Sequence, residues 1–316
     1  MWRFLFKRLI SSVVTLWLLA SMLFLIVNVL PGNPGRKLLG PQAPQESVDQ
    51  YNTKFGADRP LLEQYGKSMK RLAKLDFGDS YATGKSVVSV VRPALFRSGK
   101  LAVLALVITI PLAIFFGIYA ARRQGKFADR AVVMTGLATS SIPEFVTAAV
   151  LMSVFCVTWK FGRVFATPPP GTSVISQFRY LIFPALAMVI IYFGYIARMT
   201  RAGVINALQA DYSRTATMKG LSSGRVMRRH VLRNALAPTI TVISVQVGYL
   251  FGSIIGVERV FNYQGIGSII LNAVGKKDIP LLQGSVLIIG IIYMLSTLLA
   301  DLLIAFLNPR IRLEQS

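Results

Sequence analysis

Long apolar runs alternate with shorter polar segments along this chain of 316 residues. The first run, Leu9–Leu30, has 22 residues without a charged side chain. At about 1.5 Å per helical residue it would extend roughly 33 Å, which suffices for a hydrocarbon core about 30 Å thick. The apolar core of a secretory signal is only about 7–15 residues long, so this run predicts a retained membrane span.

Five further apolar runs have the same character. They are Leu101–Ala121, Ala131–Trp159, Tyr180–Ala197, Thr239–Val257 and Leu281–Leu307. Together the six runs predict an all-α membrane protein with six transmembrane helices.

The distribution of Lys and Arg predicts the orientation of these spans. With the N-terminus in the cytosol, the short cytosolic segments hold three, four, eight and two basic residues, against three in residues 160–179 and three in residues 257–280. Residues 31–100 add 12 more on the outer side, but loops longer than about 60 residues translocate largely regardless of charge. Both termini and residues 198–238 are therefore predicted to be cytosolic.

Residues 31–100 are polar and mixed in charge, and they lack the apolar content for a core of their own. We expect short amphipathic helices there, outside the cytosol and packed on the spans. The predicted organisation is an N-terminal segment with the first span (1–30), this extracytoplasmic loop region (31–100) and a core with the other five spans (101–312).

The composition agrees with a membrane location. The chain is 53% hydrophobic and 15% charged with a mean hydropathy of +0.56, whereas about a quarter of the residues in soluble domains are charged. The net charge of +22 raises the possibility of a nucleic-acid partner. The basic residues flank apolar runs and do not gather in one block, so we predict membrane lipids and no nucleic acid among the partners.

The chain has one cysteine, Cys156, and one histidine, His230. This excludes an intrachain disulfide framework and argues against a cysteine- or histidine-based metal centre. No GxxxxGK[ST] phosphate-binding loop is present, so the chain is not expected to bind ATP through such a loop. We predict no catalytic residues, no metal site and no cofactor on this chain.

Residues 198–238 join the fourth and fifth spans and contain eight Arg or Lys side chains. Within them Leu208–Lys219 has neither proline nor glycine and predicts a helix. Gly220 follows at the place where a helix ends in the left-handed conformation, and Leu221 can make the hydrophobic contact that accompanies such an ending.

A second helix is predicted after a cap at Ser222 or Ser223. Arg225, Arg229 and Arg233 recur every four residues on one face, which predicts an interfacial helix with a basic face. A solvated loop whose arginines hold anionic lipid is the alternative. A DNA-binding helix-turn-helix is disfavoured by the tether between two spans.

Small and polar residues mark the fifth span. Gly248, Gly252 and Gly256 recur every four residues, and such GxxxG patterns let helices approach closely. They indicate either a contact between helices that move or simply tight packing. Gln246, which lies nearby, is a candidate to face a cavity.

Three carboxylates lie in or near the spans. A charge at mid-membrane costs about 2.5–3.5 kcal/mol on insertion scales, so each should face protein or water. We expect Asp301 to be a structural partner near the cytosolic end, and Glu144 to face a cavity or pack beside Pro143. Glu258 follows the predicted fifth span on the outer side and could help to shape an external gate.

Short motifs in a fixed order carry a family resemblance. Residues 214–221 read Arg-Thr-Ala-Thr-Met-Lys-Gly-Leu, and residues 230–238 read His-Val-Leu-Arg-Asn-Ala-Leu-Ala-Pro. The other motifs are Pro31-Gly-Asn-Pro34, Phe77-Gly-Asp-Ser80, Ser141-Ile-Pro-Glu-Phe145, Tyr195-Ile-Ala-Arg-Met-Thr-Arg201, Val257-Glu-Arg-Val-Phe261, Gly265-Ile-Gly267, Asp278-Ile-Pro-Leu-Leu-Gln-Gly284 and Asn308-Pro-Arg-Ile-Arg312. The chain thereby resembles the permease subunits of binding-protein-dependent ABC importers, in the dipeptide/oligopeptide/nickel subfamily. It departs from the family pattern at Asn33, where the family often has Asp.

The resemblance implies a type I importer permease with a coupling helix, Leu208–Leu221, inserted into a groove of a separate ATPase subunit. The contacts it implies are Asp211, Tyr212, Arg214, Thr215, Ala216, Lys219, Gly220 and Leu221. ATP and Mg would bind to two ATP-binding subunits, whose closure would switch the spans between outward- and inward-open states. A homologous second permease subunit and an extracytoplasmic solute-binding protein would complete the importer in the bacterial inner membrane.

The resemblance favours peptides as cargo and leaves nickel chelates, opines and other small solutes open. Two other classes of protein predict features that the sequence does not contain. A membrane-embedded enzyme needs a nucleophile–base pair or metal ligands inside the spans. An ion-gradient-driven secondary transporter would show inverted repeats and buried ion ligands. This transporter class is the alternative to the main interpretation, a permease subunit that forms half of a translocation pathway.

Overall fold

The computed structural model describes residues 2–29, 34–56, 58–169, 171–276 and 278–307. Its helices are α1 (Trp2–Val29), α2 (Pro34–Leu39), α3 (Gln45–Phe55), α4 (Leu61–Ala73), α5 (Val87–Arg122), α6 (Phe127–Ser140), α7 (Glu144–Leu151), η1 (Met152–Thr158), α8 (Val174–Gln209), α9 (Asp211–Met218), α10 (Ser223–Val226), η2 (Met227–Val231), α11 (Leu232–Val260), α12 (Ile266–Gly275) and α13 (Ile279–Leu307), with η1 and η2 being π-helical. Apart from one isolated bridge between Asp79 and Ser86, the regular structure of these residues is helical, which confirms the predicted all-α class.

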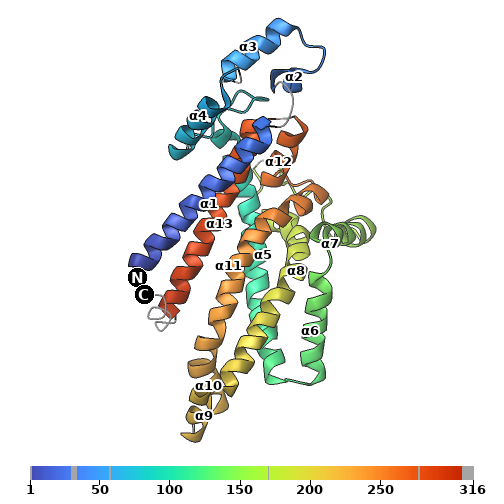
Figure 1. The fold of residues 1–316 in the computed structure, drawn as a ribbon. Coiled ribbons are helices and arrows are strands. Elements are labelled where there is room, and N and C mark those ends of the chain that lie inside the picture. The colour runs from blue at the N-terminus through green and yellow to red at the C-terminus, as the bar shows by residue number, and fades with distance from the viewer. Residues whose placement is uncertain (1, 30–33, 57, 170, 277, 308–316) are drawn as a thin grey trace.

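The helix α8 lies at the centre of the bundle and packs against α5, α6, α7 and α11 (Figure 1). On one side α13 packs against α11 and α12 and carries α1 on its outer face. Five helical segments are long and apolar enough to cross a membrane, and the pair α6–α7 makes a sixth candidate. Large apolar side chains such as Trp17, Val107 and Phe115 are exposed on these helices, as a lipid-facing surface requires.

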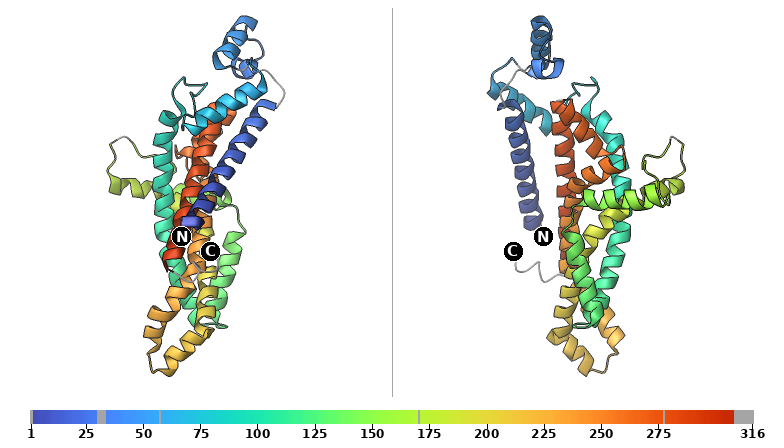
Figure 2. Two further views of the ribbon diagram at one scale, coloured as in Figure 1. Left: turned by 60° about the vertical axis from the view of Figure 1, so that its left-hand side comes forward. Right: turned by 90° about the vertical axis from the view of Figure 1, so that its right-hand side faces the viewer.

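The predicted third span is not one straight helix. α6 ends at Ser140, and α7 starts at Glu144 in a direction turned by 100°. Pro143 accounts for this break, because a proline lacks the amide donor and restricts the residue before it. With η1, α7 then projects sideways from the bundle (Figure 2). The apolar run Ala131–Trp159 thus indicated the composition of this segment but not its shape.

Several helices extend beyond the apolar runs that predicted them. The fourth predicted span lies within the longer helix α8, and the boundary drawn at residue 100 falls within α5. The predicted loop 258–280 contains the end of α11 and the whole of α12. Asn33 and the motif Asn308–Arg312 lie outside the described residues.

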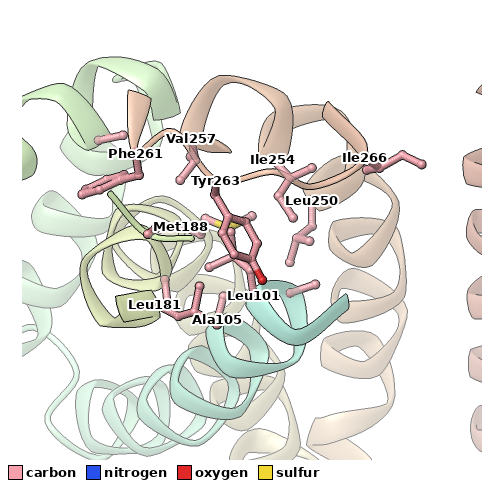
Figure 3. Close-up of a cluster of buried hydrophobic side chains, with 14 of the residues drawn as sticks. Leu101, Ala105, Leu181, Met188, Leu250, Ile254, Val257, Phe261, Tyr263 and Ile266 are labelled. Carbon is pink, nitrogen blue, oxygen red and sulfur yellow. The ribbon is translucent and has the colours of Figure 1, made fainter. Parts of the chain in front are cut away.

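The main apolar core lies where α5, α8, α11 and α12 meet (Figure 3). Phe261 and Tyr263, in the turn between α11 and α12, are almost completely buried there. The Tyr263 hydroxyl donates a hydrogen bond of 2.9 Å to the Arg97 carbonyl oxygen, which satisfies the phenol inside the core. The Ala166 amide donates to the Phe261 carbonyl oxygen at 2.9 Å and ties the segment before α8 to the same turn.

Asp278 holds the segment before α5 to the start of α13. Its carboxylate accepts hydrogen bonds from the Ser80 hydroxyl at 2.5 Å and from the amides of Tyr81 and Ala82, each at 3.0 Å. It also accepts a hydrogen bond from the Leu281 amide in the first turn of α13, at 3.3 Å. Asp278 is 1% exposed, so one buried carboxylate packs this polar segment onto the helix bundle.

Replacing Asp278 with Ala should loosen this attachment. The amides of residues 81 and 82 lose their acceptor, and each buried donor left unpaired costs about 1–3 kcal/mol. We therefore expect hydrogen exchange at these amides to accelerate roughly tenfold or more, as measured by mass spectrometry of the purified protein. Asp49→Ala, at an exposed position on α3, is the matched control. Unchanged exchange in Asp278→Ala would contradict the assignment.

Candidate functional site

The segment between α8 and α11 forms a small lobe at the end of the molecule opposite to α2, α3 and α4 (Figure 1). Ala210 separates α8 from α9 with an extended backbone, at φ −70° and ψ 149°. The predicted helix Leu208–Lys219 is therefore interrupted, and its first two residues belong to α8. The Ser213 hydroxyl donates to the Ala207 carbonyl oxygen at 2.6 Å and holds α9 against the end of α8.

The end of α9 has the predicted left-handed glycine. Gly220 has a φ of +77°. Its amide donates to the Thr217 carbonyl oxygen at 2.9 Å, and the Leu221 amide donates to the Ala216 carbonyl oxygen at 3.3 Å. These two bonds form a Schellman ending, in which only a residue without a Cβ adopts the positive φ at no cost. Leu221 then packs on an apolar cluster, which we call the lobe core, formed by α5, α8, α9, α10, η2 and α11.

The two faces of α9 differ in exposure. Ser213 and Ala216 are 3% and 5% exposed, and Ala216 belongs to the lobe core. Six other members of the predicted contact set are exposed: Asp211, Tyr212, Arg214, Thr215, Lys219 and Gly220. Leu221, the last member, is half-buried. Ala216, which the expected contact set includes, is turned toward α8 by helical periodicity and packs in the lobe core.

Met218 lies outside the predicted contact set but is 82% exposed at the end of α9. Together with Tyr212, which is 40% exposed, it adds apolar surface to a face that also carries Arg214 and Lys219. Methionine is flexible and polarisable, and it adapts to irregular binding surfaces. The small residues Ser213 and Ala216 lie three positions apart and so share one helix face, which packs inward. Met218 lies off that face, and this spacing was the sequence signal that could have placed it on the outside.

The second predicted helix of this segment is not a separate element. α10, η2 and α11 follow one another as a single candidate span, Ser223–Val260. Ser222 occupies the N-cap position without a side-chain cap hydrogen bond. Arg225, Arg229 and Arg233 are all exposed where this long helical segment leaves the lobe. A contact with anionic lipid headgroups is open to them and stays a prediction.

The three glycines of the fifth span meet different neighbours. Gly248 lies against the ring of Tyr293 in α13, where no side chain would fit. A Cβ on Gly256 would lie 3.0 Å from the Cβ of Phe145 in α7. Around Gly252 there is nothing within 4 Å of such a Cβ. Two of the glycines thus permit tight packing, against α13 and α7, and the three do not share one helix contact.

Glu258 lies inside α11 with 0% exposure. Its carboxylate accepts hydrogen bonds from the Ser98 hydroxyl at 2.5 Å and from the Gly267 amide at 2.9 Å. The Ser98 oxygen in turn accepts one from the Ile266 amide at 2.7 Å. Glu258 therefore joins α5 and α11 to the N-terminus of α12, where the helix dipole favours a negative charge. It is buried inside the subunit, as is Gln246 at 6% exposure, and neither faces an open cavity here.

Two ion pairs connect helices far apart in the sequence. Asp301 of α13 pairs with Arg8 of α1, with the Nε and Oδ2 atoms 2.8 Å apart, which gives the expected structural role a partner. The other pair was not predicted. Arg201 of α8 makes a bidentate contact with Asp129 of α6, with Nη2 and Oδ2 2.7 Å apart, and Asp129 also accepts from the Gly125 amide at 2.9 Å. No local pattern links residues 72 positions apart, so this ion pair could not be predicted from the sequence.

Glu144 lies at the first position of α7, directly after the bend from α6, and is half-buried. It is within electrostatic reach of Tyr192, whose hydroxyl lies 2.5 Å from the Ser253 hydroxyl. Over the described ranges, no group of three or more His, Cys, Asp or Glu side chains is placed to hold a metal ion.

Two protein-family models match the chain. A family model described as "Binding-protein-dependent transport system inner membrane component" matches residues 113–313. A second model, for the N-terminal part of such membrane components, matches residues 1–96.

Curated relatives match along nearly the whole chain. A probable peptide ABC transporter permease protein of Sinorhizobium fredii is 31% identical, covering 98% of this chain and 99% of the relative. A dipeptide transport system permease protein of Alkalihalophilus pseudofirmus is 31% identical, covering 97% and 98%. A glutathione transport system permease protein of Escherichia coli is 31% identical, covering 99% of each. A solved structure, a crystal structure of an amino acid ABC transporter with histidines, is 16% identical with a TM-score of 0.49, covering 71% of this chain and 94% of that chain.

The two faces of α9 predict opposite effects for neighbouring substitutions. Ala216→Glu places a carboxylate in the lobe core and should destabilise the lobe by roughly 3 kcal/mol or more. Thr215→Glu puts the same side chain on the exposed face and should change stability by about 0.5 kcal/mol or less. Limited trypsin cleavage after Arg214 and Lys219 measures the difference, because cleavage requires the lobe to open. Equal cleavage rates in the two variants would show that the faces are wrongly assigned.

Proposed function

The chain belongs to the family of binding-protein-dependent transport system inner membrane components, and from this we propose that it is one of two permease subunits of a bacterial peptide importer. The members of this family are multi-pass membrane subunits of ABC transporters, and ATP is hydrolysed on a separate subunit. The chain is thus a transport subunit and not an enzyme, and the alternative of an ion-gradient-driven transporter is discarded. We place it in the bacterial inner membrane with both termini in the cytosol, because the Lys/Arg distribution predicts that orientation.

Peptides are the cargo that the relatives support. The three curated relatives are named for peptides, dipeptides and glutathione, and glutathione is itself a small peptide. Nickel chelates and opines have no counterpart among these names. The chain would form half of the translocation pathway, and a homologous second permease subunit would form the other half.

The family implies a transporter complex with other subunits. We propose that two ATP-binding subunits, which hold ATP and Mg, contact the cytosolic side, and that a solute-binding protein delivers peptide on the opposite side. Membrane lipids cover the apolar outer faces of the helices. Nucleic acid has no place in this assembly.

The observation that carries the proposal is the exposed face of α9 at the far end of the bundle (Figure 1). It combines Tyr212 and Met218 with the charged side chains of Arg214 and Lys219, which suits a groove on an ATP-binding subunit. Asp211 in the first turn stabilises the helix start against its dipole. The exposed members of the contact set, with Thr215 and Gly220 among them, would form this coupling surface.

The lobe is attached to the bundle firmly enough to transmit a displacement. The lobe core joins α9 to α5, α8 and α11, and the hydrogen bond from Ser213 fixes the start of α9. The pair Arg201–Asp129 then links α8 to α6. Closure of two ATP-binding subunits would push α9 and carry these helices with it, and the pathway would change between outward- and inward-open states.

Gly220→Trp tests the coupling surface. The glycine has a positive φ and open space around it, so a Trp side chain would stand on the surface that we assign to the ATP-binding subunit. We expect peptide uptake to fall at least about tenfold, the loss of roughly 1.4 kcal/mol of coupling, while the protein reaches normal abundance in the membrane. Uptake by reconstituted vesicles and co-purification of the ATP-binding subunits are the measurements.

Gly171→Trp is the matched control, because Gly171 also has a positive φ, of +80°, and open surroundings but lies in the loop before α8. It shares the strain of the substitution and should leave the ATP-binding subunits attached. Normal uptake by Gly220→Trp at normal abundance would contradict the coupling role. A purified complex that lacks any ATP-binding subunit would contradict the importer assignment itself.

A further inference from the structure

Carboxylates carried by the membrane-spanning helices have partners, with one exception. In the described part of the chain these helices carry Asp129, Glu144, Glu258 and Asp301. Asp129 and Asp301 have arginine partners, and Glu258 accepts hydrogen bonds from a serine and a helix N-terminus. Glu144 alone makes no ion pair or hydrogen bond with any described residue, and it is half-buried. A carboxylate without a partner at this position needs water or a ligand.

A cation without a counter-ion lies nearby on α8. Arg201 is bound by Asp129, but Arg198, one helical turn farther into the bundle, has no carboxylate partner among the described residues. Its Nε donates to the Gly194 carbonyl oxygen at 3.0 Å, and its Nη2 lies 3.4 Å from the Ser140 hydroxyl. The guanidinium also lies over the Tyr195 ring, 5.3 Å from its centroid. Neutral acceptors and one aromatic ring therefore surround a full positive charge.

The two unpaired charges lie at the bend between α6 and α7. Ser140 is the last residue of α6 and Glu144 the first of α7, and both helices pack against α8. Arg198 reaches Ser140, so it approaches the bend from α8, whereas Glu144 follows the bend at the start of α7. Yet the structure contains no ion pair between Glu144 and Arg198. The two groups flank the same bend and are both half-buried.

The bend lies well inside the membrane. Ten helical residues separate Arg130, in the basic segment at the start of α6, from Ser140, which is about 15 Å along the helix. That is about half the thickness of a hydrocarbon core of roughly 30 Å. A charge at this depth costs about 2.5–3.5 kcal/mol on insertion scales, and two opposite charges would lower that cost by pairing. Glu144 and Arg198 do not pair with each other, so both groups are available to a ligand that carries the opposite charges.

We propose that Glu144 and Arg198 form a binding site for the two charged ends of a peptide on its way through the membrane. The Glu144 carboxylate would bind the N-terminal ammonium group, and the Arg198 guanidinium would bind the C-terminal carboxylate. Arginine suits that task because its planar fork matches a carboxylate in a bidentate contact. All unmodified peptides carry both charges, so a site for the ends tolerates any side chain between them. The inference rests on the peptide importer proposed above.

Binding of a labelled trialanine peptide to the complete purified importer in lipid nanodiscs, without its solute-binding protein, tests this assignment. Unlabelled N-acetylated and C-amidated trialanine serve as competitors, each lacking one terminal charge. A hydrogen bond to a charged group contributes about 1.5–3 kcal/mol, so each modified peptide should compete at least about tenfold more weakly than trialanine in the wild type.

The variants should lose these preferences selectively. In Glu144→Gln the penalty for the acetyl group should disappear while the penalty for the amide stays. In Arg198→Gln the reverse should hold. Arg59→Gln and Glu63→Gln remove a charge from an exposed pair on α4 and its flank, 2.7 Å apart, and should keep both penalties.

Three outcomes would overturn the proposal. They are absence of displaceable peptide binding to the wild type, unchanged preferences in both variants, and loss of the second permease subunit from either variant complex. The last would mean that the charges pair across the subunit interface. Each leaves the importer assignment intact as long as the ATP-binding subunits co-purify, so failure here is distinguishable from failure of the proposed function.

Discussion

The bundle depends on how closely the backbone of α8 approaches its neighbours. A Cβ on Gly136 of α6 would lie 3.0 Å from the Gly194 Cα, and one on Gly117 of α5 would lie 2.7 Å from a carbonyl oxygen of α8. Gly203 is packed equally tightly against the Ala235 carbonyl oxygen of α11. Lipid tails are as apolar as the side chains, so membrane helices associate through close van der Waals contact rather than through the hydrophobic effect. The glycines make α8 the helix that positions the others.

This central place joins the two surfaces that we assign to function. At its end α8 carries the lobe, and Arg201 and Arg198 connect its lower half to α6 through Asp129 and Ser140. We propose that a displacement of the lobe is carried along α8 to the bend where Glu144 lies. Closely packed interiors respond to such a displacement by switching between arrangements rather than by deforming gradually. The proposed coupling surface and the proposed peptide site would thus move as parts of one element.

Local sequence patterns predicted the features that a single segment determines. The apolar runs predicted the helices, and Gly220 with Leu221 predicted the ending of α9, because both follow from neighbouring residues. The contacts that depend on chain packing were not accessible. Glu258 follows its apolar run directly and suggested an exposed gate, but α11 extends past it and Ser98 lies 160 positions away. The inward direction of Ala216 likewise depends on where α8 ends, and the predicted fourth span stopped at Ala197 whereas α8 continues to Gln209.

The contrast between Glu258 and Glu144 shows how contacts separate structure from function inside a membrane. Both are glutamates on helices that pack against each other, and sequence reasoning treated both as candidates for a pathway. Glu258 is surrounded by hydrogen-bond donors, so its carboxylate serves to hold three helices together. Glu144 makes no ion pair or hydrogen bond with any described residue, and Arg198, which also approaches the bend, has no carboxylate partner among them. A charged group at this depth is costly without a partner. A zwitterionic peptide carries one charge for each of these two groups, which is why we propose that they bind its ends.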